Sequence, residues 1–242
     1  MISKPIVSLC FSTEENFENN LTKLILEIVQ SPEDAIIVAP EVVLSGFVYE
    51  RFEEAAAFTP YALDKLMGFI GDRLLIFTAI TKLGEEFHNI AYALSAGEVL
   101  HAQSKTKLFP LSGEVEHFSA GEPSKIIPFK FKEITIGILI CFELRFKALW
   151  QQLEGCDIIA VPAQWGKIRT EHFVTLTNAL AVMNQCYVIA SDALNEDTSG
   201  MSGIINPFGH ELRNNAAPSL ASTYEQRTVA SMRRYLDIGI NA

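Results

Sequence analysis

Cysteine, histidine and long hydrophobic runs are all scarce in this chain of 242 residues. The four cysteines form no CxxC pair and the five histidines show no HxH or HxxxH spacing, so we expect neither a metal site nor a cofactor. No run reaches the roughly 18 apolar residues of a membrane-spanning helix, and the first residues contain no apolar signal segment. We therefore expect a cytoplasmic protein with reduced thiols and no membrane partner.

Positive charge is also in short supply. Lys and Arg number 19 against 29 Asp and Glu, which gives a formal net charge of −10 at pH 7. Nucleic acids and anionic membranes bind basic surfaces, so this balance disfavours both as partners. Hydrophobic residues make up 49% of the chain, which is typical of a globular protein that buries a core without disulfides.

What the chain does contain is an alternation of short apolar runs and amphipathic segments. Strands are predicted over residues 6–11, 35–39, 74–81, 89–94, 98–103, 126–131, 134–140, 157–161, 187–191 and 203–205. Helices are predicted over residues 13–30, 61–70, 144–153 and 171–183, with a last strand and helix within 220–235. Residues 108–125 hold two prolines and two glycines and are predicted to form a long functional loop. We expect one α/β domain over residues 1–242, with hairpins as well as βα units.

The most informative stretch is Gly137–Phe146, with the sequence GILICFELRF. The predicted strand stops at Cys141, and a helix is predicted to begin almost at once. A thiol at such a turn lies beside unpaired backbone N–H groups and the positive end of the helix dipole, and both favour the reactive thiolate. An arbitrary cysteine is more often a small core residue. The position of Cys141 and its neighbours nevertheless indicate a nucleophile.

Two further polar residues follow predicted strands directly. Glu41 comes after the buried strand at 35–39, and a carboxylate at that end of a strand points into the crevice where α/β sheets bind ligands. Lys105 follows the strand at 98–103 and opens the long loop. Taken singly, a glutamate there is more often a turn cap and a lysine more often solvated surface. Only their combination with Cys141 makes a catalytic interpretation the stronger one.

These three residues, with the motifs around them, resemble the nitrilase superfamily of carbon–nitrogen hydrolases and its Glu-Lys-Cys triad. The matching motifs lie in the family's order at residues 40–47, 104–110, 137–146, 162–188 and 202–209. The sequence departs from the pattern at three positions: Lys107 stands where a histidine is usual, Ser104 where an arginine is usual, and Met183 where a glutamate is common. A structural carboxylate contact is therefore in doubt at Met183.

The resemblance implies a four-layer α-β-β-α sandwich and assigns a role to each residue. Cys141 would attack an amide carbonyl and form a thioester. Glu41 would be the general base. Lys105 would stabilise the oxyanion, with the backbone N–H of Phe142 as a second donor. A second glutamate is expected on the loop after Lys105. We assign it to Glu114, although Glu116 is close enough to compete.

Residues after the strand at 157–161 are expected to shape the substrate pocket. Trp165 is predicted to line it, and Arg169 is a candidate anchor for a substrate carboxylate, weighed against plain surface exposure. Arg145 could also pair a carboxylate, but a structural ion pair is the commoner role for an arginine at such a position.

The pattern Trp165–Arg169 is most similar to the omega-amidase-like branch, whose members release ammonia from the side-chain amide of short dicarboxylate monoamides such as 2-oxoglutaramate. An N-carbamoyl amidohydrolase and a true nitrilase remain alternatives within the enzyme class. A non-catalytic binding module and a thiol redox sensor are the alternatives outside it. The resemblance also implies a homodimer that packs face to face.

Overall fold

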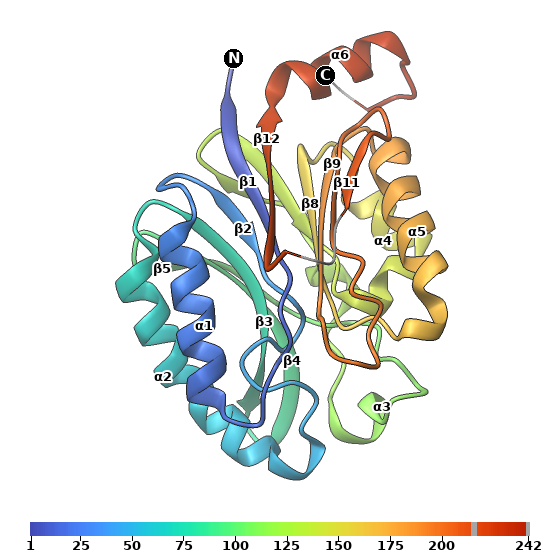
Figure 1. Cartoon of the computed structure of the whole chain (residues 1–242). Coiled ribbons are helices and arrows are strands. Elements are labelled where there is room, and N and C mark those ends of the chain that lie inside the picture. The colour runs from blue at the N-terminus through green and yellow to red at the C-terminus, as the bar shows by residue number, and fades with distance from the viewer. Residues whose placement is uncertain (214–216, 241–242) are drawn as a thin grey trace.

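The computed structural model describes residues 1–213 and 217–240, and its strands form two separate sheets (Figure 1). The first sheet has the order β12-β1-β2-β3-β4-β5 and the second the order β11-β10-β9-β8-β7-β6. The strands of the first sheet are β1 (Ser3–Leu9), β2 (Ile36–Val38), β3 (Leu74–Leu83), β4 (Glu86–Ser95), β5 (Glu98–Ser104) and β12 (Ser219–Glu225). Those of the second are β6 (Phe129–Phe131), β7 (Ile134–Ile138), β8 (Ile158–Ala163), β9 (Tyr187–Asp192), β10 (Gly203–Ile205) and β11 (Glu211–Arg213).

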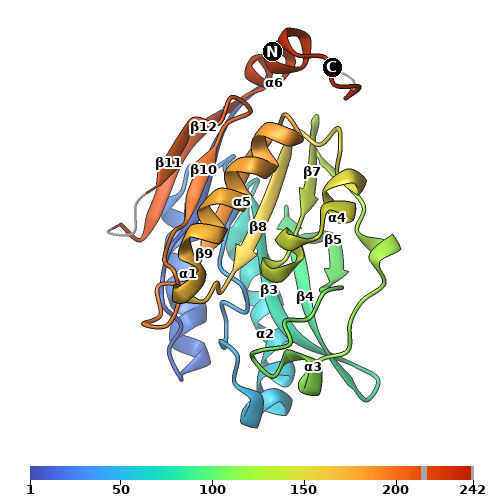
Figure 2. The same cartoon turned by 90° about the vertical axis from the view of Figure 1, so that its right-hand side faces the viewer.

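Helices cover the outer face of each sheet, so the layers follow the order α-β-β-α (Figures 1 and 2). The first sheet carries α1 (Phe17–Gln30) and α2 (Phe52–Ile70), and the second carries α4 (Lys147–Gln152) and α5 (Thr170–Met183). The short α3 (Glu114–His117) lies in the long loop, and α6 (Gln226–Tyr235) projects beyond the end of the sheets (Figure 2). The predicted four-layer sandwich is thereby confirmed. None of the described helices is long and apolar enough to cross a membrane.

The alternation of side chains along each strand explains the layers. Ile36 and Val38 of β2 pack in the core between the sheets, whereas Ile37 packs in the core beneath the helices of the first sheet. All three are fully buried, so β2 is an unbroken apolar run in the sequence.

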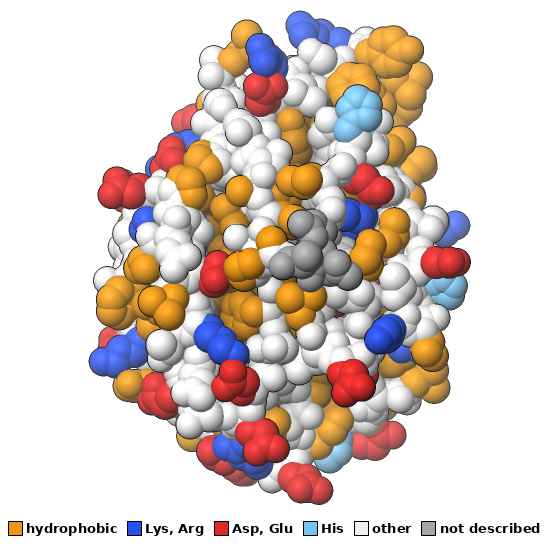
Figure 3. All heavy atoms as spheres, in the orientation of Figure 1, with side chains coloured by type: hydrophobic (Ala, Val, Ile, Leu, Met, Phe, Trp, Pro, Cys, Tyr) orange, Lys and Arg blue, Asp and Glu red, His pale blue; other side chains and the backbone are white. Residues whose placement is uncertain are grey.

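On the face drawn in Figure 3, basic side chains are scattered among acidic and hydrophobic ones.

Strand direction brings distant parts of the sequence to one edge of the sandwich. β1, β2 and β3 run parallel, as do β7, β8 and β9. β5 pairs antiparallel with β4, which pairs antiparallel with β3, so β5 runs in the direction of β3. The loops that follow β2, β5, β7 and β8 therefore meet at the carboxyl ends of the strands, and these loops contain the predicted site residues.

Two helix predictions need correction. The helix expected at 61–70 begins at Phe52, because Pro60 lies inside α2 rather than before it. Pro60 has no N–H to bond the carbonyl of Ala56 one turn earlier, and the helix continues past it on an exposed face. The helix expected at 144–153 is broken: a 3-10 turn covers Cys141–Arg145, and α4 begins only at Lys147.

Candidate active site

A cavity of about 560 Å³ opens at the carboxyl edge of the sheets. Its walls come from the loop after β2, the long loop after β5, the turn after β7 and the loops after β8 and β9. Of the residues predicted for the site, it is lined by Glu114, Cys141, Phe142, Trp165 and Arg169. Glu41 and Lys105 lie beneath it with no exposed surface.

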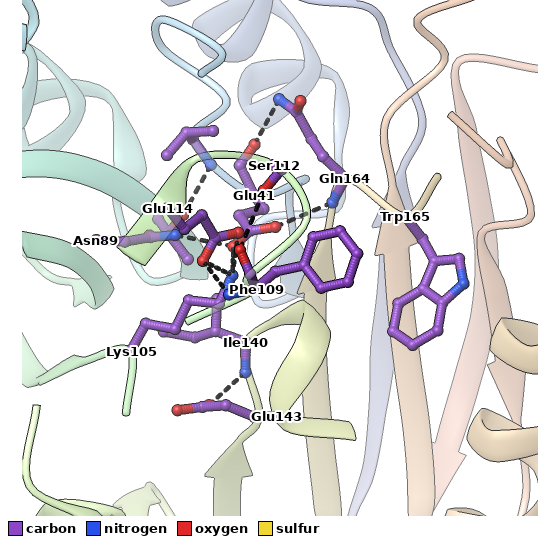
Figure 4. Close-up of polar contacts among 12 residues, drawn as sticks. Glu41, Asn89, Lys105, Phe109, Ser112, Glu114, Ile140, Glu143, Gln164 and Trp165 are labelled. Atoms are coloured by element: carbon purple, nitrogen blue, oxygen red, sulfur yellow. Dashed lines mark hydrogen bonds and ion pairs between the residues drawn. The ribbon is translucent and has the colours of Figure 1, made fainter. Parts of the chain in front are cut away.

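Lys105 is held between two carboxylates (Figure 4). Its Nζ lies 2.7 Å from Oε1 of Glu41 and 2.8 Å from Glu114, and all three side chains are buried. Burial alone would lower the pKa of Lys105, but the negative charges of Glu41 and Glu114 outweigh it and raise the pKa. Lys105 is therefore a permanently charged group at the floor of the cavity.

Glu41 accepts hydrogen bonds on both carboxylate oxygens. Oε1 accepts from Nζ of Lys105 and, at 2.8 Å, from the side-chain amide of Asn89. Oε2 accepts one longer bond of 3.2 Å, from the backbone N–H of Gln164. Oε1 is thus occupied by two strong donors, and Oε2 is the oxygen with capacity to exchange a proton (Figure 4).

Cys141 occupies a strained backbone position at the start of the 3-10 turn. Its φ of 46° lies in the left-handed region, which is uncommon for a residue with a side chain. The residue is 7% exposed, and what it exposes faces the cavity. This sharp strand-to-turn corner presents the side chain of Cys141 to the cavity, and the backbone N–H of Ile140 before it is bound to Glu143.

The surroundings of the Cys141 thiol disfavour its ionisation. Burial and the carboxylate of Glu41 raise the pKa of Cys141 well above its ordinary value, and Lys105 acts in the opposite sense with less effect. The expectation of a thiolate favoured by a helix dipole is wrong, because a 3-10 turn and not an α-helix follows the strand. A base must remove the thiol proton as the sulfur reacts.

The structure distinguishes the two candidate glutamates of the long loop. Glu114 is buried, and besides contacting Lys105 it accepts a 3.0 Å hydrogen bond from the backbone N–H of Phe109. Burial raises the pKa of Glu114, and Lys105 partly offsets this. Glu116 is exposed and does not line the cavity.

The opposite wall of the cavity carries two arginines. The guanidinium of Arg169 lies 4.9 Å from the ring centre of Phe109, and that of Arg145 lies 4.9 Å from the ring centre of Trp165. Trp165 is 3% exposed and donates from its indole N–H to the backbone carbonyl of Arg169. Phe142 lines the cavity between them, with its ring 5.1 Å from that of Phe109.

Neither arginine has an acidic partner within ion-pair distance among residues 1–213 and 217–240. The structural ion pair expected for Arg145 is therefore wrong, and its Nη2 instead lies 3.0 Å from Nδ1 of His172. Burial and the nearby charge of Arg169 lower the pKa of Arg145. Both guanidinium groups line the cavity, and neither charge is neutralised by a carboxylate of the described chain.

Two of the departures from the family pattern lie outside the buried Glu41–Lys105–Glu114 cluster. Lys107 places its ammonium 5.2 Å from the ring centre of Phe146. Met183 is 61% exposed, so this position offers a carboxylate no buried partner. Within the described chain, no three His, Cys, Asp or Glu side chains are arranged to hold a metal ion.

Three residues that contribute to the site receive no role from the sequence alone. Asn89 and Gln164 position Glu41, and Glu143 lies beneath the turn at Cys141. Asn89 was assigned only to a strand. Its signal was a polar residue at the start of an apolar run, at a position that proves to be 1% exposed.

Comparison with known proteins identifies the family of the chain. A family model described as carbon-nitrogen hydrolase matches residues 8–220. The chain belongs to the carbon-nitrogen hydrolase family. It is 26% identical to the omega-amidase YafV of Escherichia coli over 211 residues, which cover 83% of this chain and 80% of the relative. It is 32% identical over 126 residues to a deaminated glutathione amidase of Escherichia coli, a match that covers 50% of this chain and only 48% of that relative.

A solved structure supports the fold of this carbon-nitrogen hydrolase. The amidase from Nesterenkonia sp. AN1, in a mutant with the acetamide moiety of fluoroacetamide added covalently at its active-site cysteine, superposes with a TM-score of 0.81. The match covers 96% of this chain and 94% of the other at 19% identity. The predicted superfamily and the predicted class, a hydrolase of carbon–nitrogen bonds other than peptide bonds, are confirmed.

Proposed function

We propose that this carbon-nitrogen hydrolase is an omega-amidase-like enzyme that releases ammonia from the side-chain amide of a small carboxylate. Cys141 is the nucleophile, Glu41 the general base, Lys105 the oxyanion donor and Glu114 the residue that fixes Lys105. The observation that carries the proposal is the buried Lys105, held between Glu41 and Glu114 at the floor of the cavity that Cys141 faces.

The first half of the reaction joins the substrate to the enzyme. Sγ of Cys141 attacks the amide carbonyl carbon while Oε2 of Glu41 takes the thiol proton, which the raised pKa of the thiol makes necessary. Lys105, aided by the backbone N–H of Phe142, stabilises the negative oxygen that forms. The tetrahedral intermediate then collapses, Glu41 returns the proton to the departing nitrogen, and ammonia leaves a thioester on Cys141.

The second half removes the acyl group. Glu41 takes a proton from water, which attacks the thioester carbonyl at the same oxyanion site. Collapse expels the sulfur, which regains its proton from Glu41, and the carboxylate product is released. Glu41 thus accepts and donates one proton in each half, and the reaction consumes one water for each ammonia released.

The arginines on the facing wall indicate the substrate class. Arg169, with Arg145 beside it, would bind the carboxylate of a short dicarboxylate monoamide such as 2-oxoglutaramate, while its amide reaches Cys141. The similarity to the omega-amidase YafV supports this class. N-carbamoyl compounds and nitriles are the alternatives, and a carbamoyl substrate would yield carbon dioxide as well as ammonia.

We further propose that residues 1–242 act as one carbon–nitrogen hydrolase domain in a cytoplasmic homodimer. The four cysteines are free, as a reducing compartment requires. An exposed apolar patch supports self-association. Met183 at the end of α5 is 61% exposed, and Phe208 and Leu212 around the β10–β11 turn are 43% and 42% exposed.

Ammonia release from a panel of amides, carbamoyl compounds and nitriles tests the proposed function. The panel contains 2-oxoglutaramate and deaminated glutathione, each with its free carboxylate, and neutral amides of similar size. We expect release from a carboxylate-bearing amide that Cys141→Ala abolishes and that Cys10→Ala, which alters another buried cysteine, leaves unchanged. Equal turnover by Cys141→Ala would overturn the proposal.

A further inference from the structure

Glu143 is a buried carboxylate without a cation. It has no exposed surface, and among the described residues no Lys, Arg or His lies within ion-pair distance of it. Burying a carboxylate is costly unless hydrogen bonds satisfy it. The other buried glutamates among the described residues, Glu41 and Glu114, both contact Lys105 directly. The place of Glu143 therefore requires an explanation other than charge pairing.

All of its partners belong to the two segments that carry Cys141 and Lys105. Oε2 accepts a 2.7 Å hydrogen bond from the backbone N–H of Ile140, the residue before Cys141 (Figure 4). Oε1 accepts bonds of 2.6 and 2.8 Å from the backbone N–H and the hydroxyl of Thr106, the residue after Lys105. One carboxylate thus connects the strand-to-turn corner of the second sheet with the loop that leaves β5 of the first.

The same glutamate also closes the strained turn. Its backbone N–H donates at 3.0 Å to the carbonyl of Ile140, so Ile140 is bound to Glu143 through both of its backbone groups. The two bonds enclose Cys141, whose φ of 46° is unfavourable without such support. On the other side, the backbone N–H of Lys105 donates at 2.8 Å to the carbonyl of Asn89. The backbone around Lys105 is therefore held on both sides, by Asn89 at its own N–H and by Glu143 at the N–H of Thr106.

We propose that Glu143 is a positioning residue that sets the distance and orientation of Cys141 relative to Lys105. The inference rests on the proposed function, in which Cys141 attacks and Lys105 receives the developing oxyanion. Oxyanion stabilisation depends on donors placed to within a few tenths of an ångström, so a bridge one residue from each partner controls kcat without touching substrate.

Four variants test the bridge. In Glu143→Gln one end of the side chain presents an N–H to the donors it must bind, so the contact to Ile140 or to Thr106 is lost. Glu143→Asp keeps the charge on a shorter stem. Thr106→Val removes the hydroxyl donor, and Thr106→Ser restores it. Thr59→Val is the matched control, because Thr59 is a buried threonine in α2 whose hydroxyl bonds only backbone carbonyls away from the cavity.

We expect Glu143→Gln to lower kcat at least about tenfold with KM changed less than about twofold, on the scale of a misplaced oxyanion donor. Thr106→Val should lower kcat in the same way by a smaller factor, Thr106→Ser should recover it, and Glu143→Asp should fall between wild type and Glu143→Gln. Thr59→Val should lower the melting temperature and leave kcat unchanged.

Alkylation of Cys141 by iodoacetamide across pH provides a readout that a purely structural role would not move. A displaced Cys141 should alkylate with a shifted pH profile in folded Glu143→Gln and Thr106→Val. Wild-type kcat and alkylation profile in folded Glu143→Gln would overturn the inference. If that variant does not fold, equal kcat for Thr106→Val and Thr106→Ser would overturn it. Failure of the proposed function itself is separate, since it would show as full activity in Cys141→Ala.

Discussion

The floor of the cavity and the wall facing it differ in how their charged side chains are paired. We call them the paired wall and the unpaired wall. On the floor, Glu41, Lys105 and Glu114 are buried and paired before any substrate arrives. On the facing wall, Arg145 and Arg169 are partly exposed and stack on aromatic rings without an acidic partner in the described chain. In the function proposed above, the paired groups carry out the reaction, which needs fixed geometry, and the unpaired cations bind the substrate carboxylate, which needs an available charge.

The largest effect should come from removing the base of the paired wall. Glu41→Gln keeps the shape of the side chain but cannot take the proton of a thiol whose pKa is raised. We expect kcat to fall at least about a thousandfold, within the range for a lost general base. Glu116→Gln, an exposed glutamate on the long loop, is the control and should keep full activity. Steady-state ammonia release measures both, and a Glu41→Gln enzyme within tenfold of wild type would contradict the assignment.

Replacing Lys105 should cause the second-largest loss of turnover. Because Lys105 is paired with two carboxylates, its replacement should also destabilise the fold. Lys105→Met leaves two buried carboxylates without a counter-charge and is expected to destabilise the fold by about 3–5 kcal/mol. Adding Glu114→Gln should restore much of that stability but not the turnover, which should stay at least about a hundredfold low.

Lys4→Met removes a partly buried lysine of β1 that is paired with Asp34 away from the cavity, and it serves as the control for Lys105. Urea unfolding and kcat, measured on the same samples, separate the two effects. Recovery of turnover in the double variant would show that Lys105 is structural.

On the unpaired wall, Arg169→Gln should change binding and spare the chemistry. We expect KM for a carboxylate-bearing amide to rise at least about tenfold with kcat nearly unchanged, because a hydrogen bond to a charged group is worth about 1.5–3 kcal/mol. The same substrate with its carboxylate esterified should be insensitive to the substitution. Arg227→Gln alters an exposed arginine on α6 and is the control. Equal KM changes for the acid and the ester would remove Arg169 from carboxylate recognition.

The smallest effect on activity is expected at Asp192, which anchors the recognition wall from behind. It accepts a 2.7 Å bond from the backbone N–H of Trp165 and a bond from the Ser199 hydroxyl. Burial raises the pKa of Asp192 from 3.8 to about 7, so the folded state favours its protonated form.

The stabilising contribution of Asp192 is therefore complete below the unfolded-state pKa and is lost as pH rises towards 7. We expect wild type to lose about 4 kcal/mol of stability relative to Asp192→Asn between pH 4 and pH 8, at 1.36 kcal/mol per pKa unit. Urea unfolding at a series of pH values measures the difference. Parallel stability curves would show that Asp192 has an ordinary pKa.

The sequence predicted the residues of the paired wall better than the pairing of the arginines on the unpaired wall, and the reason is physical. Apolar runs define buried parallel strands, and the residue that follows each run must lie at the sheet edge, which brought Glu41 and Cys141 together. Hydrogen bonds between residues far apart in the sequence leave no such pattern. The side-chain amide of Asn89 donates to Glu41, 48 residues away, and the carboxylate of Glu143 accepts from Thr106, 37 residues away.

The charge states predicted for Cys141 and Arg145 also depended on local contacts that the sequence does not show. The proximity of Cys141 to a helix N-terminus suggested an ionised thiol, but the local turn is 3-10 and the nearest charges are mostly carboxylates. Likewise, Arg145 suggested an ion pair because arginines near strand ends usually have one, whereas here its neighbours are His172 and Trp165. One sequence cannot show which charges surround a buried group.

The central claim is that Cys141 carries the acyl group through the reaction. The most direct test is mass spectrometry of acid-quenched enzyme during turnover of an amide from the panel, using wild type and the slow Glu41→Gln variant. The account predicts an added mass equal to the substrate minus ammonia, which peptide mapping assigns to Cys141 and which is absent from Cys141→Ala. Steady ammonia release with no adduct in either enzyme, together with an active Cys141→Ala, would contradict it.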